Sequence, residues 1–217
     1  MSRSPDAFSL QDFAARAHAR LRLDLPAEAL CAGAPGLGDH SLDPGLTPTP
    51  DAAAPKPAAV LVAAVPGPEG ARLLFIERAS GLRAHAGQIA FPGGRMEAGD
   101  ESPLATALRE AEEEIGLPPE AVRPLGFLDA YQTGTGYRIV PVVAVVERPF
   151  EQRLCALEVA DAFEAPLSFL MSPENHAIVE RERGGRLRTF YAMPFGERYI
   201  WGATAGMVRN LYERLYL

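Results

Sequence analysis

The residues best suited to chemistry lie in one acidic segment, Glu97 to Glu114, which holds seven acidic residues and one basic residue. Near its end, Arg109 is followed by three glutamates at helical spacing, Glu110, Glu113 and Glu114. At roughly 100° per residue, their carboxylates occupy an arc of about 100° on one helix face. Crowded carboxylates repel one another, and a divalent cation relieves that repulsion by sharing their oxygens. The spacing therefore predicts a site for Mg²⁺ or Mn²⁺, which accept all-oxygen ligands beside phosphates.

Two further residues of this segment have other expected roles. Glu112 points to another side of the helix and is not expected to bind metal. Arg109 is expected to hold a carboxylate in place through a charge-assisted hydrogen bond. Taken alone, three consecutive glutamates also fit a solvated acidic helix face.

The helix that must position these carboxylates has clear ends. Ser102 is a capping residue and Pro103 suits the first helical position. Gly116 and Pro118 are typical of a helix end. The helix has an adjoining apolar face, which we expect to dock on a sheet: Leu104, Leu108, Ala111 and Ile115.

The rest of the chain divides into an N-terminal part, residues 1–57, and a compact domain, residues 58–217. Ser9 can cap an amphipathic helix near residues 9–24, and a linker rich in proline, alanine and glycine follows. Within the domain, strands are expected at residues 58–65, 72–78, 122–128, 139–146, 177–179 and 188–193, and helices at 159–170 and 207–217. Strands and helices interleave irregularly, which predicts an α/β or α+β sandwich with a mixed β-sheet.

Composition limits the function classes. The chain has 217 residues, 47% of them apolar, and a formal charge of −7, which suits a folded globular protein. An acidic chain without a basic stripe is a poor nucleic-acid binder, and no apolar run is long enough to predict a membrane span. Two cysteines, Cys31 and Cys155, are too few for a disulfide framework. We therefore expect a cytoplasmic protein.

The acidic segment resembles the Nudix hydrolase signature. That signature runs glycine, five residues, glutamate, seven residues and then REUxEExGU, where U is bulky and apolar. Arg109 to Leu117 matches it, with Ala111 as a small U residue. The preceding loop holds one extra residue, so that either Asp100 or Glu101 stands for the first signature glutamate.

A second motif directly upstream resembles the coenzyme A pyrophosphatase branch of the Nudix enzymes. It consists of Leu74, Arg78-Ala79, Arg83, Gly87 and Phe91-Pro92-Gly93-Gly94. The resemblance implies a Nudix α/β/α sandwich and metal-dependent cleavage of coenzyme A, or its derivatives, to 3′,5′-ADP and 4′-phosphopantetheine or its acyl form. It also implies that the Gly93 carbonyl contacts the metal.

The resemblance suggests further roles. Arg78 and Arg83 are expected to pair with phosphate oxygens, with a structural ion pair as the alternative for each. Gly87 is expected to allow close approach of the backbone or a positive φ. The general base is expected to be Glu113, Glu114 or Glu158.

The expected partner is a small-molecule diphosphate of the coenzyme A class, without nucleic acid or membrane, and a homodimer is compatible with the resemblance. Two alternatives remain open. One is cleavage of ADP-ribose, a dinucleotide or a nucleotide sugar. The other is a Nudix scaffold that binds a nucleotide without hydrolysing it.

Overall fold

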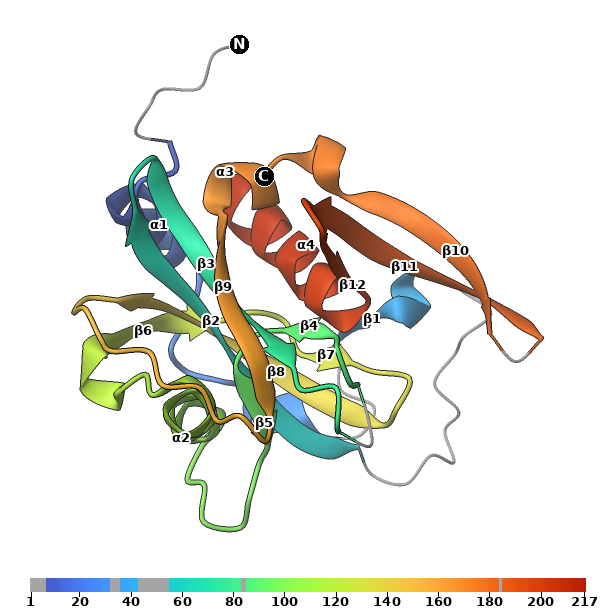
Figure 1. Cartoon of the computed structure of the whole chain (residues 1–217), viewed down its shortest axis with the longest axis horizontal. Helices are drawn as coiled ribbons and strands as arrows, with labels where there is room; N and C mark the ends of the chain where they lie inside the picture. The colour runs from blue at the N-terminus through green and yellow to red at the C-terminus, as the bar shows by residue number, and fades with distance from the viewer. Residues whose placement is uncertain (1–6, 32–35, 43–54, 83–84, 184) are drawn as a thin grey trace.

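The computed structural model describes residues 7–31, 36–42, 55–82, 85–183 and 185–217. A large mixed sheet forms the middle layer (Figure 1). Helix α2 (Pro103–Ile115) covers one of its faces. Helices α1 (Leu10–Arg20) and α4 (Ala203–Tyr216), with a smaller sheet, cover the other. This arrangement confirms the predicted α+β sandwich with a mixed sheet.

Two long strands form the centre of the large sheet. β2 (Lys56–Gly67) pairs in parallel with β8 (Tyr137–Val146) and antiparallel with β3 (Gly70–Arg78). The other strands of this sheet are short or lie further out: β1 (Leu37–Gly38), β4 (Ile89–Ala90), β5 (Gly93–Arg95), β6 (Val122–Phe127), β7 (Tyr131–Gln132) and β9 (Val159–Pro166). The strands expected at 58–65, 72–78, 122–128 and 139–146 are therefore confirmed.

The apolar run of β2 serves two cores at once. Val60, Val62 and Ala64 face α1 and α4, whereas Leu61 and Ala63 face α2. Side chains of a strand alternate between faces, so a strand buried on both sides is apolar nearly throughout.

The N-terminal helix belongs to the first of these cores. Phe13 and Ala17 of α1 are fully buried in the same cluster as the sheet residues. Ser9 caps the helix by accepting a hydrogen bond from Asp12 N at 3.0 Å. The boundary at residue 57/58 stays a prediction, while the packing joins α1 to the sheet.

Helix α2 begins and ends where its sequence predicts. The Ser102 hydroxyl accepts a hydrogen bond from Ala105 N at 3.1 Å, and Pro103 follows in the first turn. Gly116 ends the helix in the left-handed conformation, with φ 71°. Ala107, Ala111 and Ile115 are fully buried against the sheet. This docking fixes which face of α2 its glutamates present.

The prediction of a helix at residues 159–170 is wrong. Residues Val159–Pro166 form β9, which pairs antiparallel with β3, and only Leu167–Leu170 is helical, as α3. The alanines of this segment favour a helix locally, but the open edge of β3 supplies a full ladder of hydrogen bonds. Tertiary pairing outweighs a weak helix propensity.

The smaller sheet holds β10 (Ala177–Arg183), β11 (Arg186–Phe195) and β12 (Arg198–Trp201). Its first two strands extend the strands expected at 177–179 and 188–193, whereas β12 was not expected. The remaining elements are short 3-10 turns: Ala27–Leu30, Asp39–Ser41, Pro119–Ala121 and Pro173–Asn175. No helix in the described part of the chain is long and apolar enough to cross a membrane.

Candidate active site

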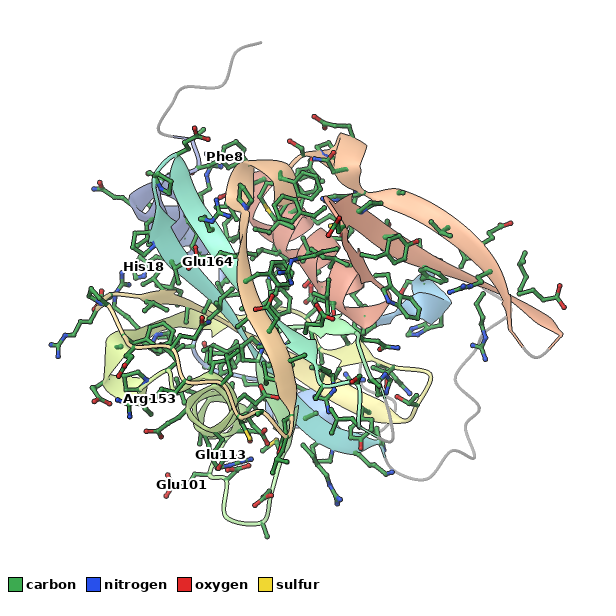
Figure 2. The ribbon with its side chains drawn as sticks, viewed as in Figure 1. Phe8, His18, Glu101, Glu113, Arg153 and Glu164 are labelled. Carbon is green, nitrogen blue, oxygen red and sulfur yellow. The ribbon has the colours of Figure 1, made fainter. Side chains whose placement is uncertain are left out.

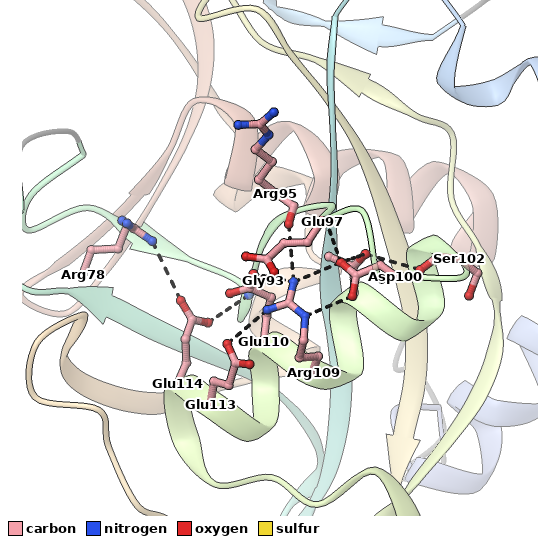
Figure 3. Close-up of polar contacts among 11 residues, drawn as sticks. Arg78, Gly93, Arg95, Glu97, Asp100, Ser102, Arg109, Glu110, Glu113 and Glu114 are labelled. Atoms are coloured by element: carbon pink, nitrogen blue, oxygen red, sulfur yellow. Dashed lines mark hydrogen bonds and ion pairs between the residues drawn. The ribbon is translucent and has the colours of Figure 1, made fainter.

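Arg109 and Asp100 form a clamp at the entrance to α2 (Figure 3). The Asp100 carboxylate accepts hydrogen bonds from Arg109 Nε and Nη2, both at 3.0 Å. It also accepts from Glu97 N at 2.8 Å and from the Thr106 hydroxyl at 2.9 Å. The Arg109 guanidinium, followed by the other donors, holds the pKa of Asp100 well below its usual range.

This clamp distinguishes the two residues that the sequence left as alternatives. Asp100 is buried against Arg109, with its side chain 7% exposed, whereas Glu101 is exposed (Figure 2). That Asp100, and not Glu101, stands for the first signature carboxylate stays a prediction, which its pairing with Arg109 favours. Its full set of donors makes it a positioning residue for Arg109.

The same arginine reaches two of the predicted metal ligands. Arg109 Nη2 lies 3.0 Å from Glu110 Oε1, and Arg109 Nη1 lies 3.1 Å from Glu113 Oε2. The Glu113 side chain is 60% exposed, and that of Glu110 is 14% exposed. Burial raises the pKa of Glu110, and the neighbouring Arg109 opposes that rise. Arg109 was expected to hold one carboxylate, and it pairs with three, those of Asp100, Glu110 and Glu113.

Two glycines make room for this arrangement. Gly93 has φ 151°, and a Cβ there would collide with Ala59 O and Val60 in β2. A Cβ on Gly94 would lie 2.7 Å from Glu110 Oε2. A larger residue at either position would therefore displace β5 from β2 or Glu110 from the site.

Glu114 is the most deeply buried carboxylate of the site, with its side chain only 2% exposed. Its Oε2 accepts a hydrogen bond from Gly93 N at 2.9 Å, and its Oε1 lies 3.9 Å from Arg78 Nη1 (Figure 3). Within the described part of the chain, Oε1 has no hydrogen-bond partner. Burial raises the pKa of Glu114 to about 7, and the Gly93 N–H only partly offsets this.

Glu158 joins this group from the segment before β9. That segment lies beside the last turn of α2, because Cys155 N donates to Glu114 O at 2.9 Å. Within the segment, Glu158 N donates to Cys155 O at 2.9 Å. The Glu158 side chain is exposed, and its charge adds to the elevation of the Glu110 and Glu114 pKa values. The fold thus brings together four carboxylates from two separate segments.

The upstream motif is placed in part. Arg78 ends β3 and lies beside Glu114, as described above. Gly87 turns the chain with φ 66° and donates its N–H to Arg78 O at 2.9 Å. A Cβ on Gly87 would meet open space, so its positive φ, not crowding, favours glycine there. Arg83 lies outside the described residues.

The carboxylates have not converged on a single point. Across the described ranges, no three Asp, Glu, His or Cys side chains are grouped as a ready-made metal site. Arg109 draws Glu110 and Glu113 toward itself, while Glu114 turns toward Gly93. The metal-binding roles of Glu110, Glu113, Glu114 and the Gly93 carbonyl stay predictions.

Sequence reasoning missed two contacts of the site. The Thr106 hydroxyl on Asp100 lies one helical turn from Ser102, so a capping motif was a usable signal. The bond from Gly93 N to Glu114 joins residues 21 apart, and nothing in the local sequence predicts it.

The family model of the NUDIX domain matches residues 55–178, which is more than half of the chain. The chain belongs to the Nudix hydrolase family. An uncharacterized Nudix hydrolase NudL of Cronobacter sakazakii is 40% identical over 154 residues, or 71% of this chain and 80% of the relative. Its namesake in Escherichia coli (strain K12 / DH10B) is 38% identical over the same shares.

Among solved structures, the NUDIX domain of Shewanella oneidensis NrtR, in complex with ADP ribose, matches 81% of this Nudix hydrolase. It does so with 16% identity, 97% coverage of that chain and a TM-score of 0.49. The family assignment confirms the resemblance seen in the signature segment. Nudix hydrolases act on small-molecule diphosphates, generally with a divalent metal ion, and the names of the NudL relatives specify no substrate.

Proposed function

We propose that this Nudix hydrolase cleaves the diphosphate of coenzyme A, or of its derivatives, to 3′,5′-ADP and 4′-phosphopantetheine or its acyl form. The observation that carries the proposal is the contact between the two motifs. Arg78 of the upstream motif lies 3.9 Å from Glu114 of the Nudix signature. An arginine at that point is within reach of a diphosphate bound beside the carboxylates, and its planar fork suits phosphate oxygens.

The residues present fit a divalent cation. Glu114 Oε1 is buried without a hydrogen-bond partner among the described residues, and a cation would complete its coordination. Glu110 lies nearby with a raised pKa, and all the donors are oxygens, as Mg²⁺ and Mn²⁺ prefer. Glu110, Glu114, Glu113 and the Gly93 carbonyl would hold the ion. When bound, it would neutralise diphosphate charge and acidify a water molecule.

Glu158 is the best-placed general base of the three candidates. Glu113 is paired with Arg109, and Glu114 is engaged by Gly93 N and lies beside Arg78. Within the described part of the chain, no arginine or lysine forms an ion pair with Glu158, and its side chain is exposed. It can accept the proton of a water whose oxygen attacks phosphorus, while the anhydride P–O bond breaks and the second phosphate leaves.

The base assignment predicts a specific kinetic change. Glu158→Gln should lower kcat by about 10²-fold and leave KM nearly unchanged, because the lost group acts on the water and not on substrate binding. Retention of the wild-type kcat in Glu158→Gln would move the role to Glu113 or Glu114.

The substrate assignment is tested with purified protein, Mn²⁺ or Mg²⁺, and four diphosphates: coenzyme A, dephospho-coenzyme A, ADP-ribose and NADH. Products are identified by mass spectrometry. We expect coenzyme A to have the highest kcat/KM, about ten- to a hundredfold above dephospho-coenzyme A, if charge-assisted bonds read its 3′-phosphate. Faster cleavage of ADP-ribose would overturn the branch assignment, and binding without any cleavage would support the non-catalytic alternative.

A further inference from the structure

Arg78 and Glu114 lie beside each other without a hydrogen bond between their side chains. Arg78 Nε and Glu114 Oε1 are both buried without a hydrogen-bond partner in the described part of the chain. The 3.9 Å from Arg78 Nη1 to Glu114 Oε1 is close enough for an ion pair and too long for a hydrogen bond. A buried polar group without a hydrogen-bond partner destabilises the folded state, so these two atoms are suited to bind a ligand.

The backbone holds Arg78 at this point from both sides. Arg78 N donates to Gln88 O at 3.0 Å, and Gly87 N donates to Arg78 O at 2.9 Å. On the other side, the pairing with β9 shifts register between Glu77 and Arg78, which is a β-bulge. Bulges redirect side chains and are common beside active sites. The fold therefore fixes the backbone of Arg78 beside the last turn of α2.

We propose that Arg78 couples cation binding to diphosphate binding, an inference that rests on the proposed function of this site. Without ligands, Arg78 neutralises part of the Glu114 charge. When a cation takes Glu114 Oε1, the guanidinium loses that partner and turns to a diphosphate oxygen. Binding of the cation then raises the affinity for the diphosphate, and binding of the diphosphate raises the affinity for the cation. The reason is that Arg78 cannot pair fully with Glu114 and with a phosphate oxygen at the same time.

The substitution Arg78→Gln should have opposite effects on two quantities: the affinity for Mn²⁺ alone should not fall, whereas the gain in Mn²⁺ affinity caused by a diphosphate should fall. In Arg78→Gln, Mn²⁺ alone should bind as tightly as in the wild type or up to about tenfold more tightly, because its competitor for Glu114 is gone. Methylenediphosphonate, a diphosphate analogue that is not hydrolysed, should tighten Mn²⁺ binding about tenfold or more in the wild type and clearly less in Arg78→Gln, where only the direct attraction between cation and diphosphonate remains.

The measurement is Mn²⁺ affinity by electron paramagnetic resonance and calorimetry, with and without methylenediphosphonate, corrected for Mn²⁺ bound by the diphosphonate in free solution. Arg95→Gln is the matched control, since Arg95 is exposed on β5 and contributes its carbonyl, at 3.4 Å from Arg109 Nη2, to the network. This control removes one positive charge near the site and should keep the full gain. Equal losses in both variants would show a general charge effect and overturn the proposal.

Two other results would also overturn it: weaker binding of Mn²⁺ alone in Arg78→Gln, or an unchanged gain from the diphosphonate. If Arg78→Gln does not fold, Arg78→Lys decides the matter, because it keeps the charge and loses the planar fork. It should bind Mn²⁺ alone like the wild type and lose most of the gain. Coupling without coenzyme A cleavage would keep this inference and reject only the substrate assignment.

Discussion

Two carboxylates at opposite ends of α2 have opposite environments. Before the first turn of the helix, Asp100 accepts hydrogen bonds from Arg109 Nε and Nη2, Glu97 N and the Thr106 hydroxyl, and its pKa is lowered. In the last turn, Glu114 accepts a hydrogen bond only from Gly93 N among the described residues, and its pKa is raised to about 7. Both side chains are largely buried.

This difference separates a carboxylate whose hydrogen-bond needs are met by the protein from one whose needs are met only in part. Asp100 already has the donors that its charge requires, so its ionised form stabilises the folded state. Glu114 is desolvated without full compensation, so its ionised form costs stability until a cation or another donor arrives. Arg109 pairs with Asp100 and also contacts Glu110 and Glu113.

The largest expected effect is the loss of activity when Glu114 is replaced. Glu114→Gln should lower kcat/KM by about 10³-fold, because it removes the charge that a cation needs while preserving side-chain volume. Steady-state kinetics with Mn²⁺ measures the change. Glu112→Gln is the matched control, since Glu112 is exposed on the same helix, and it should retain activity within about twofold.

A second expectation concerns the pH dependence of stability without metal. Because the pKa of Glu114 is raised from 4.5 to about 7, the protonated carboxyl group contributes to the free energy of unfolding. This contribution is fully present below pH 4.5 and is lost as the pH rises through 7. The loss amounts to about 3 kcal/mol. Chemical denaturation between pH 5 and pH 8 measures it, and Glu114→Gln should remove this part of the slope.

The comparison with Glu114→Gln is necessary because His176 acts in the opposite direction. Burial lowers the pKa of His176, so its contribution is lost as the pH falls through the same range. Mg²⁺ should stabilise the wild type more at pH 8 than at pH 5. If the free energy of unfolding changed with pH by the same slope in the wild type and in Glu114→Gln, the proposed difference between Asp100 and Glu114 would be contradicted.

Asp100→Asn should lower the free energy of unfolding by about 2 kcal/mol, because the charge-assisted hydrogen bonds from Arg109 are weakened. Glu101→Gln is the neighbouring control and should change it by less than about 0.5 kcal/mol, since Glu101 is exposed. Urea denaturation at pH 7 compares them. Equal effects would mean that the clamp does not distinguish the two residues.

The smallest expected effect is at Glu113, which is exposed and shared with Arg109. Glu113→Gln should lower kcat/KM about tenfold and weaken Mn²⁺ binding, with little change in stability. Glu112→Gln should change neither quantity. Equal losses at these adjacent positions would contradict the assignment of one helix face to the metal.

Local signals in the sequence determined much of this protein. The Ser102 cap, Pro103 and Gly116 define α2 because they satisfy or end its own backbone hydrogen bonds. The apolar runs of β2 and β8 identify buried strands, since both faces of each need apolar neighbours. The spacing from Arg109 to Leu117 was sufficient for the family.

Only the tertiary structure decided the properties that depend on distant partners. Residues 159–166 became a strand because β3 offered an edge, against their local preference for helix. Asp100 differs from Glu101 because Arg109 reaches one and not the other. The raised pKa of Glu114 arises from burial and from the nearby charges of Glu110 and Glu158, and the Gly93 N–H on β5 and Arg78 on β3 oppose that rise only in part. Sequence spacing specifies which groups a helix carries, whereas desolvation and charge pairing depend on what the fold packs against them.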